Sequence, residues 1–567
     1  SVLYFSDIIN GFVGHSTNKF KFSTPEGSNI YEIPFTLHIT ADSTPGAGID
    51  YVKNMPFTVE LSLMQNGWPK QLGTSSTSSP LLVDLKQNGE RVLVFGDASG
   101  KVHALKSNGA ELTGFPVEIA PNSNILNGVA IANLSGDAKL EIVAAAQNGT
   151  VKIIDHNGQV LASATLQGNI RNCPVIADVS GDNQLEIIIG TQLKNLYVLD
   201  GITLEPKTGF PLTYEAPIIA NMAAEDMNND GKKEIIFASN QKLHVINGTN
   251  GEELAGWPVD LPNPSLHGPT VSNFDNDPNT KEIVIAGTAS TNCPLTIYNQ
   301  DGSVLASILS PSAIKSEIVP FQMTADAPYE ILYLDYAGRV FVRNSSLQTI
   351  NPFPVQVDPA VESSPIVYSL TAANSNNIIF GDNDGWIHAI DLEGNDIAGF
   401  PIRAGFNIKT APTIGYFDGD NDVDLMFHNE SEVVFIDYKY PGFGGQWINF
   451  RGSSNRTAST FDNSSVDADE QIIVPLVNNL DQNYPNPFNP NTSISFSIKN
   501  NTPVKLTVYN AKGQRVKTLV NDTMNAGQHS VNWNGKDSNN KSVASGVYFY
   551  KIETNDFNST RKMMLIK

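Results

Sequence analysis

One short pattern recurs eight times along the 567 residues of the chain. In each copy an apolar run leads into a loop rich in Asp and Asn, and a second apolar run follows. The loops begin at Asp84, Asn133, Asp178, Asp226, Asn273, Gln322, Ser369 and Tyr416, so successive copies start 45 to 49 residues apart. Repetition at this period, with several strands in each unit, is typical of β-propeller blades. The sequence therefore predicts an all-β fold in which residues 64–452 form an eight-bladed β-propeller.

The fourth copy shows the repeating unit most clearly. Its loop, Asp226–Glu234, lies between the apolar runs Asn221–Ala224 and Ile235–Ala238, and Lys242–Asn247 follows as a third run before Gly-Trp-Pro at Trp257. Short β-branched and apolar runs separated by Gly, Asn and Asp indicate antiparallel strands joined by tight turns. We expect four strands from each copy, which make one blade.

An aromatic residue closes most copies, usually within Gly-(Phe/Trp)-Pro. It follows the start of the loop by 31 or 32 residues in six of the eight copies, at Phe115, Phe210, Trp257, Phe353, Phe400 and Trp447. This fixed phase favours packing between blades over a row of sugar-binding rings. Trp447 is expected to supply the outer strand of the eighth blade. Trp68 has no repeat before it, which indicates an amino-terminal strand that helps to close the ring.

The loop of the fourth copy places oxygen-bearing groups at alternate positions. Asp226, Asn228, Asp230, the carbonyl of Lys232 and Glu234 stand at positions 1, 3, 5, 7 and 9. This pattern resembles the calcium loop of FG-GAP and VCBS propeller repeats, and calcium is bound by several such oxygens. The resemblance implies a Ca²⁺ ion in this loop.

Other copies keep the pattern unevenly. The acids and their partners are Asp178, Ser180, Asp182 and Glu186 in the third copy, Asn133, Ser135, Asp137 and Glu141 in the second, and Asp418, Asp420 and Asp424 in the eighth. Because two carboxylates bind calcium weakly, we expect occupancy at roughly one to three blades. The alternative is that these side chains only accept hydrogen bonds from turn amides, as in Asx-turns. The sequence leaves both interpretations open.

No pattern typical of a catalytic site is present. His103, His244 and His388 occupy the same slot of the third strand, where the third copy has Tyr197, so we expect them to pack locally in separate blades. The chain lacks Gly-x-Ser-x-Gly, His-Glu-x-x-His, a Gly-rich phosphate loop and paired cysteines. Cys173 and Cys293 are expected to be separate buried thiols. We predict that this chain is not an enzyme.

Charge and hydropathy exclude two further classes of function. The formal net charge is −22, from 36 basic and 58 acidic residues, whereas nucleic-acid binding needs clustered Lys and Arg. The chain also has no apolar run of about 18 residues, the length that a membrane-spanning helix requires.

The amino-terminal residues 1–63 contain strand-like runs at Phe20–Phe22, Ile33–Thr40 and Pro56–Leu63. They predict a partial Ig-like β-sandwich and resemble the end of the Ig-like spacers that follow catalytic domains in large secreted bacterial peptidases. The first residues lack a signal-peptide pattern, so we expect the chain to begin inside a longer precursor. A strand from a second copy could complete the sandwich and give head-to-tail self-association.

The carboxy-terminal residues 483–567 carry five ordered motifs. They are Asn483–Phe496, Val504–Val516, Gly527–Gly535, Ala544–Tyr550 and Lys562–Lys567. Together they resemble a type A sorting domain of the bacterial type IX secretion system, a FlgD-like Ig fold with seven expected strands. The resemblance implies recognition by the outer-membrane translocon and delivery to the cell surface or medium. The polar residues 453–482 are expected to be a flexible linker.

Two classes of function follow. The first is a non-catalytic surface module whose propeller face binds a protein or glycan, or serves a structural purpose. The second is an accessory region of a larger secreted hydrolase, a peptidase or glycosidase, whose catalytic domain lies upstream. A subunit of an extracellular head-to-tail assembly is a third interpretation.

Overall fold

The computed structural model describes residues 32–41, 51–60, 68–461 and 478–566, apart from gaps at 325–327, 358–359, 373–374, 406, 421, 430, 439–441, 481–482, 484–485, 499–501, 525–526 and 539–540. Every regular element in these ranges is a strand, and none is a helix that could cross a membrane. The prediction of an all-β propeller with a carboxy-terminal Ig-like sandwich is confirmed.

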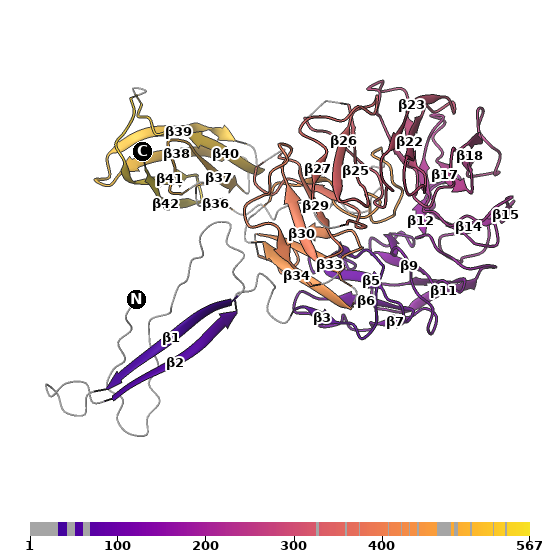
Figure 1. The fold of residues 1–567 in the computed structure, drawn as a ribbon, viewed down its shortest axis with the longest axis horizontal. Helices are drawn as coiled ribbons and strands as arrows, with labels where there is room; N and C mark the ends of the chain where they lie inside the picture. The colour runs from indigo at the N-terminus through magenta and orange to yellow at the C-terminus, as the bar shows by residue number, and fades with distance from the viewer. Residues whose placement is uncertain are drawn as a thin grey trace.

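Each copy of the repeat forms one antiparallel sheet of a ring (Figure 1). The first four sheets consist of β4 (Leu81–Val83), β5 (Val92–Gly96), β6 (Lys101–Leu105) and β7 (Val117–Glu118); β8 (Ala130–Ala132), β9 (Glu141–Ala145), β10 (Thr150–Ile154) and β11 (Val160–Thr165); β12 (Val175–Ala177), β13 (Glu186–Gly190), β14 (Asn195–Asp200) and β15 (Leu212–Thr213); and β16 (Ala223–Glu225), β17 (Glu234–Ser239), β18 (Lys242–Asn247) and β19 (Val259–Asp260).

The other four sheets follow in chain order. They consist of β20 (Thr270–Ser272), β21 (Glu282–Ala286), β22 (Cys293–Tyr298) and β23 (Val304–Ser310); β24 (Val319–Phe321), β25 (Glu330–Leu334), β26 (Arg339–Arg343) and β27 (Val355–Gln356); β28 (Ile366–Tyr368), β29 (Asn377–Gly381), β30 (Trp386–Ile390), β31 (Ile402–Arg403) and, against β28, β35 (Gly445–Trp447); and β32 (Thr413–Gly415), β33 (Val423–His428) and β34 (Glu432–Tyr438) with β3 (Lys70–Gln71).

The middle strands of the sheets are buried on both faces because each sheet is packed between two neighbours. Every residue of β5, β9, β13 and β17 is buried. This explains why the sequence shows continuous apolar runs where a half-exposed sheet would alternate apolar and polar residues. Cys173 and Cys293 are both buried free thiols, as predicted.

The ring is closed at its rim by the amino-terminal strand β3, which pairs with β34. Trp68 lies just before β3, packs edge-on against Phe435 at 5.5 Å, and donates a hydrogen bond to the carbonyl of Ser107 in the first sheet at 2.7 Å. The expectation that Trp68 helps to close the ring is confirmed. The expectation for Trp447 is wrong, because Trp447 lies on β35 and pairs with Val367 of an innermost strand.

Residues 445–461, here called the axial segment, pass among the innermost strands of the ring. Main-chain N–H groups of Ile131, Ile176, Ala224 and Val271, each on the innermost strand of a different sheet, donate to its carbonyls at 2.9 to 3.1 Å. Its residues 449–459 are almost all buried. The expectation of a flexible linker from Ser453 is therefore wrong for residues 453–461, because their polar groups bond to the ring and not to water.

The two faces of the ring differ in what they carry. Antiparallel pairing places the loops after each first strand and each third strand on one face, here called the junction face. Trp68 contacts a third-strand loop at Ser107, and Phe461 lies 5.2 Å from the ammonium of Lys281 in a first-strand loop, so both connections to the rest of the chain leave from this face. The opposite face carries the remaining loops.

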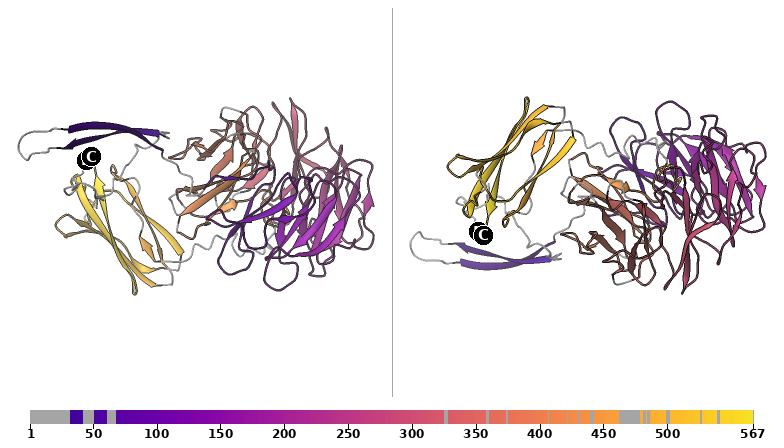
Figure 2. Two further views of the ribbon diagram at one scale, coloured as in Figure 1. Left: turned by 90° about the horizontal axis from the view of Figure 1, so that it is seen from below. Right: turned by 90° about the horizontal axis from the view of Figure 1, so that it is seen from above.

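Outside the ring the structure describes a hairpin and a sandwich. The hairpin pairs β1 (Glu32–Ala41) with β2 (Tyr51–Glu60), and the strand-like run Phe20–Phe22 lies outside the described residues. The sandwich has seven strands in two sheets: β36 (Asn479–Leu480), β37 (Thr492–Ile498) and β40 (Gly527–Trp533) in one, and β38 (Thr502–Asn510), β39 (Arg515–Met524), β41 (Gly546–Glu553) and β42 (Asn558–Leu565) in the other. Figure 2 shows both units at one end of the molecule and the ring at the other.

Candidate functional site

Seven of the eight first-strand loops share one construction, in which a side chain at the start of the second strand, buried in all of them except the half-buried Glu330, caps the loop. Its oxygen accepts the main-chain N–H of the second loop residue. The pairs are Glu141 with Leu134 (2.7 Å), Glu186 with Val179 (3.0 Å), Glu234 with Met227 (2.9 Å), Glu282 with Phe274 (2.8 Å), Glu330 with Met323 (2.9 Å), Asn377 with Leu370 (2.8 Å) and Asp424 with Phe417 (2.6 Å). This recurrent residue therefore has a structural task in every copy that has it.

In the fourth copy the side chains predicted to bind calcium are turned toward turn amides. The two carboxylate oxygens of Asp226 accept the N–H groups of Asp230 and Gly231 at 3.1 and 3.0 Å. Asp230 in turn accepts the N–H of Lys232 at 2.9 Å. The Asx-turn interpretation thus describes this loop well. Burial and the nearby Asp230 and Asp226 raise the pKa of Glu234 to about 7.

In the third copy a lysine lies where a cation would bind. The ammonium of Lys207, from the loop after the third strand, is 2.9 Å from Glu186 Oε1 and 3.8 Å from Asp182 Oδ2. Asp178 accepts the main-chain N–H groups of Gly181 and Asn183. The Lys207 ammonium therefore offsets part of the negative charge of this loop. In the second copy Asp137 and Asn133 accept turn amides in the same way.

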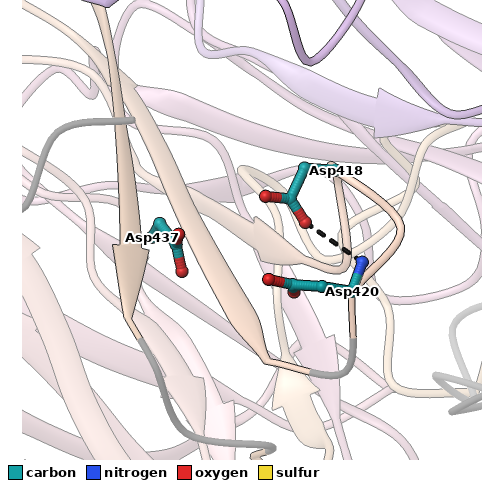
Figure 3. A group of neighbouring side chains, drawn as sticks. All are labelled: Asp418, Asp420 and Asp437. Carbon is teal, nitrogen blue, oxygen red and sulfur yellow. Dashed lines mark hydrogen bonds between the residues drawn. The ribbon is translucent and has the colours of Figure 1, made fainter. Parts of the chain in front are cut away.

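Only the eighth copy brings carboxylates together among the residues that the structure describes. Ligand oxygens of Asp418, Asp422 and Asp424 lie within 4.8 Å of one another, and so do those of Asp418, Asp420 and Asp437. Figure 3 shows Asp418 and Asp420 on the loop and Asp437 on the adjacent strand β34. Asp418 belongs to both groups, so the five carboxylates form one cluster, here called the acidic cluster.

Asp424 gives the acidic cluster the character of a cation site. Its side chain is fully buried; Oδ2 accepts the N–H of Phe417, and Oδ1 has no hydrogen-bond partner in the described part of the chain. Burial and the neighbouring carboxylates of Asp418 and Asp437 raise the pKa of Asp424 to about 8. A bound divalent cation would satisfy the free oxygen and favour the charged carboxylate. The residues present therefore fit Ca²⁺.

Two members of the acidic cluster were missed in the sequence. Asp422 stands at position 7 of the same alternating row, so the row itself could have identified it. Asp437 lies on the third strand, directly opposite Asp424 in the sheet. No local pattern indicates Asp437, because its place follows from the pairing of β33 with β34.

The recurrent histidines pack locally, as expected. His103, His244 and His388 stack on Phe95, Phe237 and Phe380 of the adjacent strand at centroid distances of 5.0, 4.8 and 5.0 Å. Each also contacts a carboxylate of its own sheet: Glu111 at 2.6 Å, Glu253 at 2.6 Å and Asp382 at 2.8 Å respectively. They do not form a shared site.

Comparison with known proteins gives a family match within the carboxy-terminal sandwich and low-identity likenesses over a larger part of the chain. Residues 487–556 match the FlgD Ig-like domain family. No curated protein matches the chain. Among solved structures, the chain is similar to the Vibrio cholerae biofilm matrix protein Bap1, with 14% identity, a TM-score of 0.46 and coverage of 68% of this chain and 93% of that one.

Two further structures are similar at the same low level. They are the Dos1 propeller, with 10% identity, a TM-score of 0.42 and coverage of 64% and 93%, and BamB from Moraxella catarrhalis, with 17% identity, a TM-score of 0.38 and coverage of 63% and 96%. We draw no functional conclusion from these likenesses.

A buried histidine of the eighth sheet makes the stability of the ring depend on pH. His428 on β33 is buried, contacts Phe95 of the first sheet edge-on at 4.4 Å, and has no hydrogen-bond partner for either ring nitrogen among the described residues. Burial, with a smaller contribution from His103, lowers the pKa of His428 to about 3. The unfolded chain, with an ordinary pKa near 6.5, binds this proton first, so stability falls as the pH drops from about 6.5 toward 3.

We predict that His428→Leu reduces the loss of unfolding free energy between pH 6.5 and pH 4 by roughly 3 kcal/mol, as 2.5 pH units imply. Denaturant unfolding at the two pH values measures this difference. His156→Leu, a half-buried histidine in a turn, is the control and should retain the wild-type pH dependence. Equal acid sensitivity of wild type and His428→Leu would contradict the assignment.

Proposed function

We propose that this chain is a non-catalytic binding or structural module of a secreted protein, displayed at a bacterial cell surface or released into the medium. The observation that carries the proposal is the axial segment. It occupies the centre of the ring, where an open propeller has a channel, and it engages innermost strands by main-chain hydrogen bonds. A ligand would then meet the ring on its faces or its rim.

The opposite face is the better candidate for ligand binding, because both connections to the rest of the chain leave from the junction face. Loops of the opposite face expose the apolar side chains of Leu193, Leu266 and Tyr336 at 60%, 55% and 45%. Contiguous exposed apolar patches mark interaction surfaces, and we propose that these three side chains contribute to one. A protein or glycan is the class of ligand we propose there.

The export route is proposed from the carboxy-terminal motifs and the Ig-like sandwich that contains them. We predict that the full chain, preceded by a signal peptide, reaches the medium or cell surface in a host with a type IX secretion system, and that it accumulates inside an otherwise identical host lacking the translocon. Immunoblotting of cell and extracellular fractions measures this, with a periplasmic protein as the control. Equal extracellular amounts in both hosts would refute the route.

An accessory region of a larger secreted hydrolase is the alternative proposal. It leaves the binding face and the export route unchanged and adds a catalytic domain upstream. The coding sequence before Ser1 distinguishes the two, since a peptidase or glycosidase domain there would favour the alternative.

We also propose that the acidic cluster binds Ca²⁺ and stabilises the eighth sheet. The support is the free, buried Oδ1 of Asp424 beside the other carboxylates. A ligand at about 100 times its dissociation constant stabilises the folded state by about 2.7 kcal/mol. We predict that calcium added to the chelator-treated full chain raises the melting temperature of the ring.

Asp418→Asn tests the calcium proposal most directly, because Asp418 belongs to both carboxylate groups and Asn can still accept the N–H of Asp420. This variant should lose the calcium-dependent rise in melting temperature. The matched control is Asp137→Asn in the second copy, which should keep it. A wild-type chain that shows no response to calcium would rule the site out.

A subunit of an assembly is a second candidate function, and two outer strands favour it. Six outer strands of the ring are only two residues long, whereas β11 and β23 have six and seven residues. These two sheets are the ones whose repeats lack the closing aromatic. Both strands read Val-Leu-Ala-Ser, carry no charge or proline, and expose Leu161 at 53% and Leu309 at 63%. Long uncharged edges of this kind are templates for strand pairing.

The proposed occupant of each edge is the matching edge of a second copy, because the two edges share one sequence and their uncharged strands let two acidic chains approach. We predict a mass above that of the monomer in light scattering at concentrations well above micromolar. Leu161→Lys together with Leu305→Lys should restore the monomer, while Ile202→Lys, an exposed apolar residue in a turn, should not. A monomeric wild-type chain would refute this second function.

A further inference from the structure

The axial segment contacts all eight sheets of the ring. Besides its main-chain bonds to the second to fifth sheets, it forms at least one contact with each of the others. These include Arg456 Nη2 to the carbonyl of Ser79 (3.3 Å), Arg451 Nη1 to Glu317 Oε2 (2.9 Å), Trp447 paired with Val367, and Thr413 Oγ1 to Asn449 Oδ1 (2.6 Å). The axial segment thus links sheets that lie far apart in the sequence.

Two buried guanidinium groups dominate these contacts. Arg451 also donates to the carbonyls of Met222 and Pro269 at 2.6 and 2.8 Å, and Arg456 donates to the carbonyl of Val129 at 3.0 Å. No more than 1% of the surface of either residue is exposed. Arg451 Nε has no partner among the described residues, whereas the other guanidinium nitrogens of both arginines donate to buried acceptors. Removing either side chain would leave buried acceptors unpaired, so the ring and the two side chains depend on each other.

The main chain of the axial segment is held in an unfavourable shape. Arg451, Arg456 and Ala458 have φ angles of 61°, 64° and 52°, in the left-handed region that residues other than glycine seldom adopt. Three such residues within eight positions indicate that the ring imposes this path. The segment would lose this shape as soon as it left the ring.

The last sheet meets the first at a seam, which is held at the rim through strand pairing and through packed side chains. There β3 contributes two residue pairs, Lys70 with Val433 and Gln71 with Glu432, and Trp68 packs in one apolar cluster with residues of both sheets. At the axis the seam is bridged by Asn449, which bonds to Thr413 of the eighth sheet, and by Arg456, which bonds to Ser79 of the first.

We propose that residues 445–461 are a clasp that docks on the ring and leaves it as one unit. Its release frees the innermost strands of all sheets together, so opening of the ring is governed at the axis and not at the rim seam. The ring can therefore reach its closed state only when the chain extends through Ser459, far beyond the last repeat.

Hydrogen exchange of the full chain, read by mass spectrometry, tests the proposal with Arg456→Met, which keeps an apolar stem and removes the donors. The amides of Ile131, Ile176, Ala224 and Val271 should exchange at least about tenfold faster, and together, although Arg456 contacts only the first two sheets and Phe450. Arg171→Met, an exposed arginine, should leave them unchanged.

Two outcomes would overturn the clasp. One is faster exchange restricted to the strands beside Ser79 and Val129, which a local packing role predicts. The other is equal or faster exchange of the four amides when the rim seam is weakened by Trp68→Ala. If Arg456→Met does not fold, Glu317→Gln replaces it; this change weakens the bond to Arg451 and keeps the side-chain volume, and the same four amides report the result.

Discussion

Two arginine side chains buried among main-chain carbonyls at the centre of the ring are the interaction on which the rest of this structure depends. In each sheet of a propeller, the strand nearest the axis is short. Its main-chain N–H and C=O groups on the side facing the axis have no neighbouring strand to pair with. Arg451 and Arg456, with the main chain around them, supply those partners to sheets far apart in the sequence. Unpaired, these groups would each cost free energy, and so would the charges.

The first-strand loops of the junction face share one capping construction but differ in the charge around the cap. The capping side chain at the start of the second strand holds the loop in seven of the eight copies, as an asparagine in the seventh and as an acid in the other six. What differs is the balance of charge around it. Lys207 offsets part of the negative charge of the third loop, whereas the eighth gathers five carboxylates, including Asp424 with one buried oxygen that has no partner in the described part of the chain. The calcium proposal therefore rests on a degenerate copy of the repeat.

The outer strands at the rim of the ring also differ from copy to copy. Where a repeat ends in an aromatic residue and proline, the outer strand is cut to two residues and presents almost no free edge. Where that closure is missing, β11 and β23 run on and stay open. Free edges are normally protected in natural proteins, and the proposed assembly rests on these two exceptions.

The sequence by itself determined the architecture and much of the packing. Its period placed every loop, the phase of the aromatics identified them as packing residues, and the shared slot of His103, His244 and His388 assigned them to separate sheets. It could not place Trp447, residues 453–461 or Asp437. A polar run reads as exposed, but here its partners include main-chain groups of the innermost strands of four sheets, which meet only when the ring closes. Likewise Asp437 joins Asp424 only through strand pairing. The repeat pattern predicts the local structure of each loop and strand. The position of the axial segment and the composition of the acidic cluster depend on contacts that exist only in the closed ring.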